Sequence, residues 1–175
     1  MTEITIHTLA ADQLDTEAHA LAQIMADTVM SGAAIGYMQP FSLAEGLAFF
    51  TGQVFGEVRA GRRRLLVARL GGETVGSVQL IIALPPNQPH RCEVAKMMVA
   101  PRVRRRGIGR ALMQALDAEA RAAGKSLITL DTKTGDKAEP LYLAAGFRTA
   151  GMIPGFALDA DGAQLHATTY MYKAL

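Results

Sequence analysis

A stretch rich in arginine and glycine near the middle of the chain carries the residue types best suited to binding phosphate groups. It reads VAPRVRRRGIGRAL over residues 99–112. A strand that ends there, followed by a helix that begins at Gly107, leaves unpaired backbone N–H groups and the positive end of a helix dipole in the loop. Gly107 and Gly109 lack side chains, so a bulky anion can approach the backbone closely. The stretch therefore predicts a diphosphate cradle, with arginines around it to screen further charge.

Two common phosphate-binding motifs do not fit this stretch. The dinucleotide motif GxGxxG fails because Leu112 stands at the third glycine position. The P-loop of nucleoside-triphosphate-binding proteins fails because the stretch contains no Gly-Lys-Ser or Gly-Lys-Thr. What remains is the pattern Arg/Gln-x-x-Gly-x-Gly/Ala, present as Arg104-x-x-Gly107-x-Gly109.

Hydrophobic periodicity and turn residues predict the elements that hold this loop. Strands are expected over residues 3–8, 64–70, 74–82, 92–99, 127–131, 147–152 and 168–173. Helices are expected over residues 15–30, 42–60, 107–123 and 137–145. The strand before the arginine loop, the helix after it and the next strand form a βαβ unit. The prediction is a mixed α/β (α+β) fold with a six- to seven-stranded, mostly antiparallel sheet, four helices and this central βαβ unit.

Polar and glycine residues predict where the first two helices begin and end. Asp15 or Thr16 is expected to cap the first helix, and Ser42 with Glu45 has the spacing of a capping box before the second. Gly61 is expected to end the second helix in the left-handed conformation.

Two motifs resemble those of one superfamily. Arg104-x-x-Gly107-x-Gly109 resembles the acetyl-CoA signature of the GCN5-related N-acetyltransferase (GNAT) superfamily, and residues 138–147 (AEPLYLAAGF) look like its motif A-x-x-[LF]-Y-x-x-x-G-F. The order of elements agrees over the whole chain, which implies one acetyltransferase domain over residues 1–175 with acetyl-CoA as cosubstrate. The resemblance implies these cofactor-binding residues: Met97, Met98, Val99, Arg104, Arg105, Arg106, Gly107, Ile108, Gly109, Arg110, Ala111, Thr134, Asp136, Ala138 and Tyr142.

A narrower resemblance concerns the acceptor. Segments at residues 31–38, 93–99, 130–132, 153–156 and 161–168 look like the tabtoxin-resistance acetyltransferase group, whose members acetylate a small amine toxin. The resemblance implies that the substrate is a primary amine of a small molecule, such as an amino-acid-like toxin or an antibiotic.

One position departs from the superfamily pattern. Gly135 stands where many members have an asparagine that contacts the pantetheine arm, and Thr134 or Asp136 is expected to take its place.

The resemblance also implies direct transfer of the acetyl group from thioester to amine in a ternary complex. Tyr142 stands at the position of the general acid that protonates the leaving thiolate, and a phenol is protonated at neutral pH. A backbone N–H near Met98 or Val99 is expected to polarise the thioester carbonyl. The alternative for Tyr142 is a tyrosine that only packs in the core or against the cofactor.

Two carboxylates and one loop complete the expected site. Glu93 and Asp131 are the candidates for the base that takes the proton of the amine, directly or through a water. Either carboxylate has an alternative as a structural acceptor or as the partner of Lys96 or an arginine. The loop residues Tyr37 and Met38 are expected to line the acceptor pocket, with simple loop packing as the alternative.

The charge distribution excludes a generally basic, nucleic-acid-binding chain. The net charge is +2, yet residues 94–116 hold six positive and no negative side chains, so the rest of the chain is acidic overall. The arginine patch is short and has no interleaved aromatic residues, so no nucleic-acid partner is expected. The competing functions are a protein or peptide N-acetyltransferase and a non-catalytic CoA-binding sensor. By analogy with the superfamily, a homodimer that pairs through the C-terminal strand is expected.

Further expectations concern location and metals. Apolar stretches are short and interrupted, so no membrane span is expected, and the first residues lack the pattern of a signal peptide. The single cysteine, Cys92, excludes an internal disulfide and suits a reducing, cytoplasmic location. Cys92 is expected to be an inert thiol, and the histidine spacing predicts no metal site.

Overall fold

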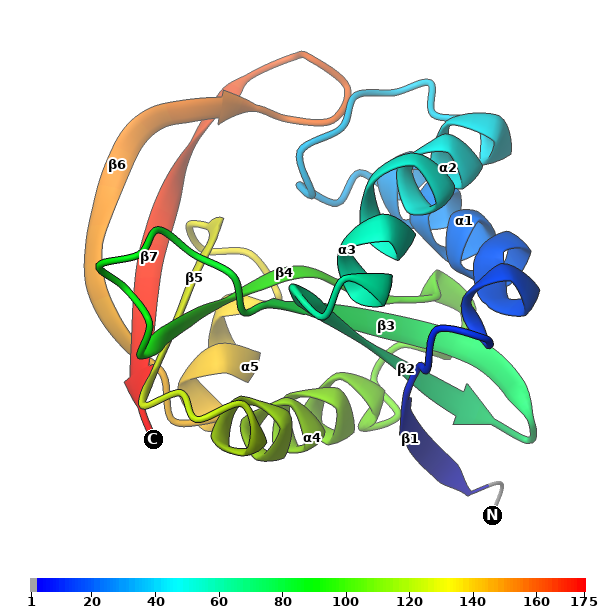
Figure 1. Cartoon of the computed structure of the whole chain (residues 1–175). Coiled ribbons are helices and arrows are strands. Elements are labelled where there is room, and N and C mark those ends of the chain that lie inside the picture. Colours follow the sequence, from blue (N-terminus) through cyan, green and yellow to red (C-terminus); the bar gives the residue numbers. More distant parts are fainter. Residues whose placement is uncertain (1–2) are drawn as a thin grey trace.

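A single mixed sheet of seven strands organises the chain in the computed structural model, which describes residues 3–175 (Figure 1). The strands are β1 (Ile4–Thr8), β2 (Arg63–Leu70), β3 (Glu73–Ile81), β4 (Arg91–Val99), β5 (Leu127–Lys133), β6 (Arg148–Leu158) and β7 (Leu165–Ala174). Their order in the sheet is β1-β2-β3-β4-β5-β7-β6, and only β4 and β5 are parallel neighbours. The predicted mostly antiparallel sheet of six to seven strands is confirmed, with seven strands.

Helices cover both faces of this sheet. They are α1 (Leu14–Met30), α2 (Leu43–Phe49), α3 (Phe55–Arg59), α4 (Ile108–Ala122) and α5 (Glu139–Ala144). Figure 1 shows α4 and α5 on one face and α1, α2 and α3 on the other. A π-helical turn, η1 (Phe50–Val54), joins α2 to α3, so the continuous helix expected over residues 42–60 is interrupted. Counted as one interrupted helix, these pieces give the four helices expected.

The helix ends follow the predicted capping residues at two of three places. Ser42 and Glu45 form the capping box at the start of α2, and Gly61 is left-handed with φ +71° after α3. The predicted cap of α1 is wrong, because the helix begins at Leu14, ahead of Asp15 and Thr16, and has no side-chain cap. Leu14 is fully buried, and its burial extends the helix toward the core by one residue.

The sheet opens between β4 and β5. The two strands pair only at Arg91–Leu127, Cys92–Ile128 and Glu93–Thr129, after which β4 follows β3 while β5 follows β7. An extra residue in β4 shifts its register with β3, and Lys96 adopts φ +50° within this bulge. Bulges bend a strand and increase its twist. The second half of β4 therefore has a backbone edge that β5 does not occupy.

The last two strands are longer than predicted. The turn-rich segment expected between residues 152 and 168 shrinks to residues 159–164, because pairs such as Ala157–His166 and Leu158–Leu165 continue the ladder past a second bulge. Figure 1 shows β6 and β7 curving beyond the rest of the sheet toward the loop that follows α1. The C-terminal hairpin therefore reaches over the open side of the sheet.

Three further features of the structure concern the expectations about membrane spans, metal ligands and the cysteine. No helix within residues 3–175 combines the length and the apolar character needed to cross a bilayer. No three His, Cys, Asp or Glu side chains gather as metal ligands would in the same part of the chain. Cys92 is buried, and burial raises the pKa of its thiol to about 11, so the thiol is protonated and inert at neutral pH.

Candidate active site

A cavity of about 750 Å³ lies where β4 and β5 separate. Its walls come from the end of α1 and the loop that follows it, from β4, from the arginine loop with the first turn of α4, and from the ends of β5 and the start of α5. The lining comprises residues 28, 31–36, 93–99, 104, 105, 107–110, 130–132, 136–138, 141 and 142. The opening of the sheet thus brings both predicted motifs to one cavity.

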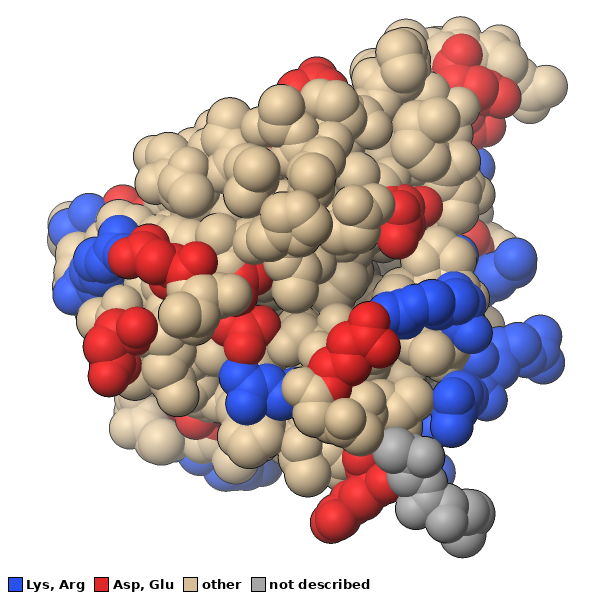
Figure 2. All heavy atoms as spheres, turned by 90° about the vertical axis from the view of Figure 1, so that its right-hand side faces the viewer, with Lys and Arg blue, Asp and Glu red and all other residues tan. Residues whose placement is uncertain are grey.

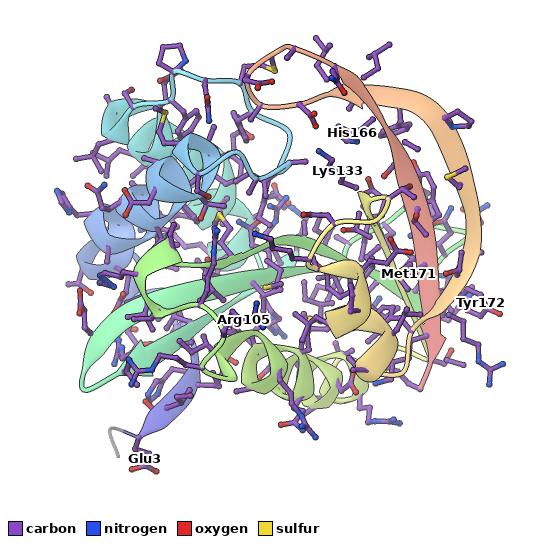
Figure 3. All side chains as sticks on the ribbon, turned by 180° about the vertical axis from the view of Figure 1, so that it is seen from behind. Glu3, Arg105, Lys133, His166, Met171 and Tyr172 are labelled. Atoms are coloured by element: carbon purple, nitrogen blue, oxygen red, sulfur yellow. The ribbon has the colours of Figure 1, made fainter. Side chains whose placement is uncertain are left out.

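The cradle at the start of α4 fits a diphosphate. Gly107 precedes the helix with φ +85°, a conformation that favours glycine, and an added Cβ there would meet nothing within 4 Å. The backbone N–H groups of the first turn are therefore accessible and carry no side-chain cap. Arg105 and Arg110 also line the cavity, and Figure 3 shows Arg105 beside the loop that leads into α4. This combination of exposed N–H groups and arginines suits the diphosphate of acetyl-CoA.

Gly109 serves a different purpose from Gly107. A Cβ at Gly109 would lie 3.0 Å from Cδ2 of Leu141, so the glycine allows α4 and α5 to pack closely. The motif therefore needs glycine at its two positions for different reasons: at Gly107 for the backbone conformation, and at Gly109 for the close packing of two helices.

Arg104 shapes the mouth of the cavity. Its Nε donates to the carbonyl of Val99 at 3.1 Å, and its guanidinium donates to Oγ of Ser31 at 3.1 Å. Arg104 thereby joins the end of β4 to the loop after α1. All the arginines of residues 102–110 are exposed, and Figure 2 shows basic side chains gathered along one edge of the molecule.

Tyr142 lies at the inner end of the cavity with 7% of its surface exposed. Burial raises the pKa of its phenol far above the usual value, and the negative charges of Asp131 and Asp136 raise it further. The ring packs edge-on against Phe147, with 6.0 Å between centroids. The phenol is therefore fixed and protonated, the state that a proton donor requires.

Both predicted carboxylates line the cavity, in different environments. Glu93 pairs with Arg91 at 3.2 Å, so the alternative of an arginine partner applies to Glu93. Asp131 accepts a hydrogen bond from the hydroxyl of Thr168 at 3.2 Å and forms no ion pair within residues 3–175. Unlike Glu93, Asp131 is not held in an ion pair by any described residue, so its carboxylate is more available to accept a proton.

Five of the predicted site residues lie outside the lining: Arg106, Ala111, Thr134, Tyr37 and Met38. Tyr37 packs edge-on against Phe41 and Phe49, because its ring belongs to the apolar layer under α2. The hydroxyl of Thr134 is engaged with that of Thr169 at 2.8 Å. Met38 is 45% exposed. The contacts of Tyr37 are those of the loop-packing alternative, whereas Met38 is exposed and lies outside the lining.

The departure at Gly135 has a conformational reason. Gly135 has φ +74°, and its N–H donates to Glu139 at 2.7 Å in the turn before α5. Asparagine is among the residues that tolerate this left-handed region best after glycine. Asp136 lines the cavity and remains the candidate for the missing asparagine contact.

Lys96 is a lining residue that the sequence analysis did not place in the site. Its Nζ donates to the carbonyl of Ile35 at 2.7 Å and lies 5.4 Å from the centroid of the Tyr37 ring. Burial lowers the pKa of its ammonium group, although Asp131 opposes that shift. The available signal was a lone ionisable residue inside an otherwise apolar strand segment, AKMMV.

Two loops meet beside the cavity, around a smaller pocket that shares Ser31 and Gly32 with it. The backbone N–H of Gln39, in the loop between α1 and α2, donates to the carbonyl of Ala160 at 2.7 Å. Lys133, at the end of β5, forms an ion pair with Asp159 in the same turn. Figure 3 shows Lys133 at this end of the molecule, near His166 and away from Arg105. We call these two contacts the loop bridge: the first joins the C-terminal hairpin to the loop after α1, and the second joins the hairpin to the end of β5.

Comparisons with known proteins agree with this geometry. Residues 37–147 match the acetyltransferase (GNAT) family. An otherwise uncharacterized N-acetyltransferase encoded in the hisH-hisA intergenic region of Azospirillum brasilense is 30% identical over 143 residues, which cover 80% of this chain and 82% of the relative.

Solved structures share the fold along nearly their whole length. An N-acetyltransferase from Staphylococcus aureus Mu50 has a TM-score of 0.80 at 19% identity, covering 99% of each chain. A ribosomal-protein-alanine N-acetyltransferase from Brucella melitensis has a TM-score of 0.80 at 24% identity, covering 98% of this chain and 99% of the other. The yncA protein of Salmonella typhimurium, solved with its cofactor acetyl-CoA, has a TM-score of 0.79 at 21% identity, covering 98% of this chain and 94% of the other. The chain described here belongs to the GNAT family of N-acetyltransferases, which use acetyl-CoA as the acetyl donor.

Proposed function

We propose that this enzyme acetylates the primary amine of a small molecule, by direct attack of the amine on acetyl-CoA while both are bound. The loop bridge is the observation that carries this proposal. A protein or peptide acceptor needs an open groove, whereas the Gln39–Ala160 hydrogen bond and the Lys133–Asp159 pair tie the C-terminal hairpin to the loop after α1 and to β5, both of which line the cavity. Solved relatives named for a protein substrate and for a small one, phosphinothricin, share this fold below 25% identity, so the fold alone does not separate the two.

The lining residues suit each step of a direct transfer. The cradle at Gly107 holds the diphosphate, and the unpaired edge of β4 near Met98 and Val99 offers a backbone N–H to the thioester oxygen. Asp131 takes the proton from the amine, whose nitrogen then forms the new bond to the acetyl carbon. The carbon–sulfur bond breaks, and Tyr142 donates its proton to the departing thiolate.

Release of free CoA thiol tests the proposed function. With acetyl-CoA present, small primary amines are expected to raise the rate of thiol release at least about tenfold above hydrolysis, while peptides with a free N-terminus leave it near the background rate. Faster release with peptides than with any small amine would support the protein-substrate alternative. Stabilisation by acetyl-CoA in thermal unfolding without release with any acceptor would indicate a sensor.

A homodimer through β6 is a second part of the proposal. The C-terminal strand expected from the sequence is β7, which is already paired with β5 on one side and β6 on the other, so the edge strand β6 takes its place. A cytoplasmic location, which the free thiol of Cys92 supports, is a third part. β6 is an edge strand whose residues are almost all exposed, and it has no charged side chain from residue 149 to residue 158. Met152, Ile153 and Phe156 are each at least 45% exposed. Long, uncharged edge strands invite pairing with another strand, and an antiparallel pair of identical strands suits a two-fold axis.

Ile153→Lys is expected to convert the dimer to a monomer, because two lysines would approach across the axis. Sedimentation velocity on the purified protein measures the change, which halves the apparent mass. Leu143→Lys, an equally exposed apolar position on α5, is the matched control and should leave the mass unchanged. A wild-type protein that sediments as a monomer at tens of micromolar would refute this part.

A further inference from the structure

Lys96 places a half-buried positive charge in the cavity, with no carboxylate of residues 3–175 in an ion pair with it. Its single hydrogen bond goes to the carbonyl of Ile35, at 2.7 Å, so two of the three N–H donors of the ammonium group remain free. Within residues 3–175 it forms no ion pair, as no carboxylate oxygen lies within 4.0 Å of its Nζ. A charge that is partly removed from water is stabilised by a partner of opposite charge, which this ammonium group lacks among residues 3–175.

The surroundings of Lys96 favour an anionic partner from outside the chain. Burial lowers the pKa of Lys96, Asp131 raises it, and the positive charge of Arg63 lowers it again. An anion bound beside the ammonium group would offset part of the free energy that removal from water costs. The ring of Tyr37 and the Ile35 carbonyl hold the side chain in place, so it is oriented before a ligand arrives.

The cofactor is not the partner that this geometry favours. The phosphate groups are met by the first turn of α4 and by Arg105 and Arg110, which follow the end of β4. Lys96 lies earlier in β4, within the bulge, and its side chain reaches the loop after α1 at Ile35. That loop also carries Gln39 of the loop bridge.

Opposite charges thus face one cavity on the acceptor side. Asp131 supplies a carboxylate suited to an amine, and Lys96 supplies an ammonium group suited to an oxyanion. An α-amino acid carries both groups on neighbouring carbon atoms. Resting on the proposed function, we propose that Lys96 binds the carboxylate of an amino-acid-like acceptor and selects acceptors that carry such a group next to the primary amine.

Paired substrates test this inference without any variant. Each standard α-amino acid is compared with its carboxamide in the CoA-release assay. The amine of the carboxamide loses its proton more readily, so intrinsic reactivity favours the amide. We expect the enzyme to prefer at least one acid over its amide by about 10- to 100-fold in kcat/KM, as for a charge-assisted hydrogen bond.

The variant Lys96→Met then tests whether Lys96 causes this preference for the acid over the amide. The substitution keeps the length of the stem and removes the charge, and it is expected to lower kcat/KM for the preferred acid by about 10- to 100-fold. The value for the amide and the KM for acetyl-CoA should stay unchanged. Lys125→Met is the matched control, because Lys125 also donates to a backbone carbonyl, that of Pro89, but lies outside the cavity. Thermal unfolding of both variants verifies that each is folded.

The outcomes separate this inference from the proposed function. Turnover of small amines with no preference for any acid overturns the inference and leaves the function standing. A preference that survives in Lys96→Met, or a rise in the KM for acetyl-CoA alone, also overturns it. No turnover with any small amine refutes the proposed function itself.

Discussion

Tyr142→Phe is expected to lower kcat by about 100-fold or more, because a positioned general acid contributes roughly that much. Phenylalanine keeps the ring that packs against Phe147 and removes only the hydroxyl group. Without the proton from the phenol, the CoA thiolate must leave as an anion. The KM for acetyl-CoA should change by less than about threefold, since the phenol acts on the leaving group and not on the diphosphate.

The high pKa of Tyr142 adds a second readout. Burial and the nearby carboxylates Asp131 and Asp136 favour the neutral phenol, so its folded-state pKa lies above the ordinary value near 10. Ionisation of Tyr142 should therefore cause no loss of rate on the alkaline side up to about pH 10. Stopped assays across pH measure both effects.

Tyr172→Phe is the matched control for this substitution. Tyr172 lies on β7, is 37% exposed and does not line the cavity, and Figure 3 shows it at the outer side of the hairpin. Its kcat should equal that of the wild type. An unchanged kcat in Tyr142→Phe would mean that Tyr142 only packs.

Asp131→Asn is expected to lower kcat at neutral pH by about 100-fold, because the protonated amine has no lone pair and the amide of asparagine cannot take its proton. Asp131 is the stronger candidate of the two carboxylates because Glu93 is held by Arg91. Glu93→Gln should therefore reduce kcat less. Affinity for acetyl-CoA should change little in either variant.

The pH dependence of Asp131→Asn separates a base from a structural acceptor. Without a base, the rate follows the free amine, so it should rise about tenfold per pH unit until the pKa of the acceptor is reached. Asp27→Asn, on the exposed face of α1, is the control and should behave as the wild type. A flat loss of rate at all pH values would indicate that Asp131 only supports the fold through Thr168.

Much of the fold and the proposed cofactor half of the site could be predicted from the sequence, because the motifs and turn residues that indicate them act over a few neighbouring positions. The left-handed Gly61 and the capping box of Ser42 with Glu45 each depend on a few neighbouring residues. The spacing of Arg104, Gly107 and Gly109 places a loop at a helix start whatever the rest of the chain does. Elements were harder to delimit where pairing with a distant strand decides their length, as in β6 and β7.

The acceptor half depends on contacts that no local pattern contains. Lys96 meets Ile35 across 61 positions of sequence, and Gln39 meets Ala160 from another loop. Tyr37 turned into the aromatic layer with Phe41 and Phe49 because burial of its ring outweighs exposure in the cavity. The proposed cofactor-binding site could therefore be predicted from the amino-acid sequence, because it uses one loop and one helix end. The arrangement of Lys96 and Asp131 that we propose for the acceptor forms only when β4, β5, the loop after α1 and the C-terminal hairpin come together in space.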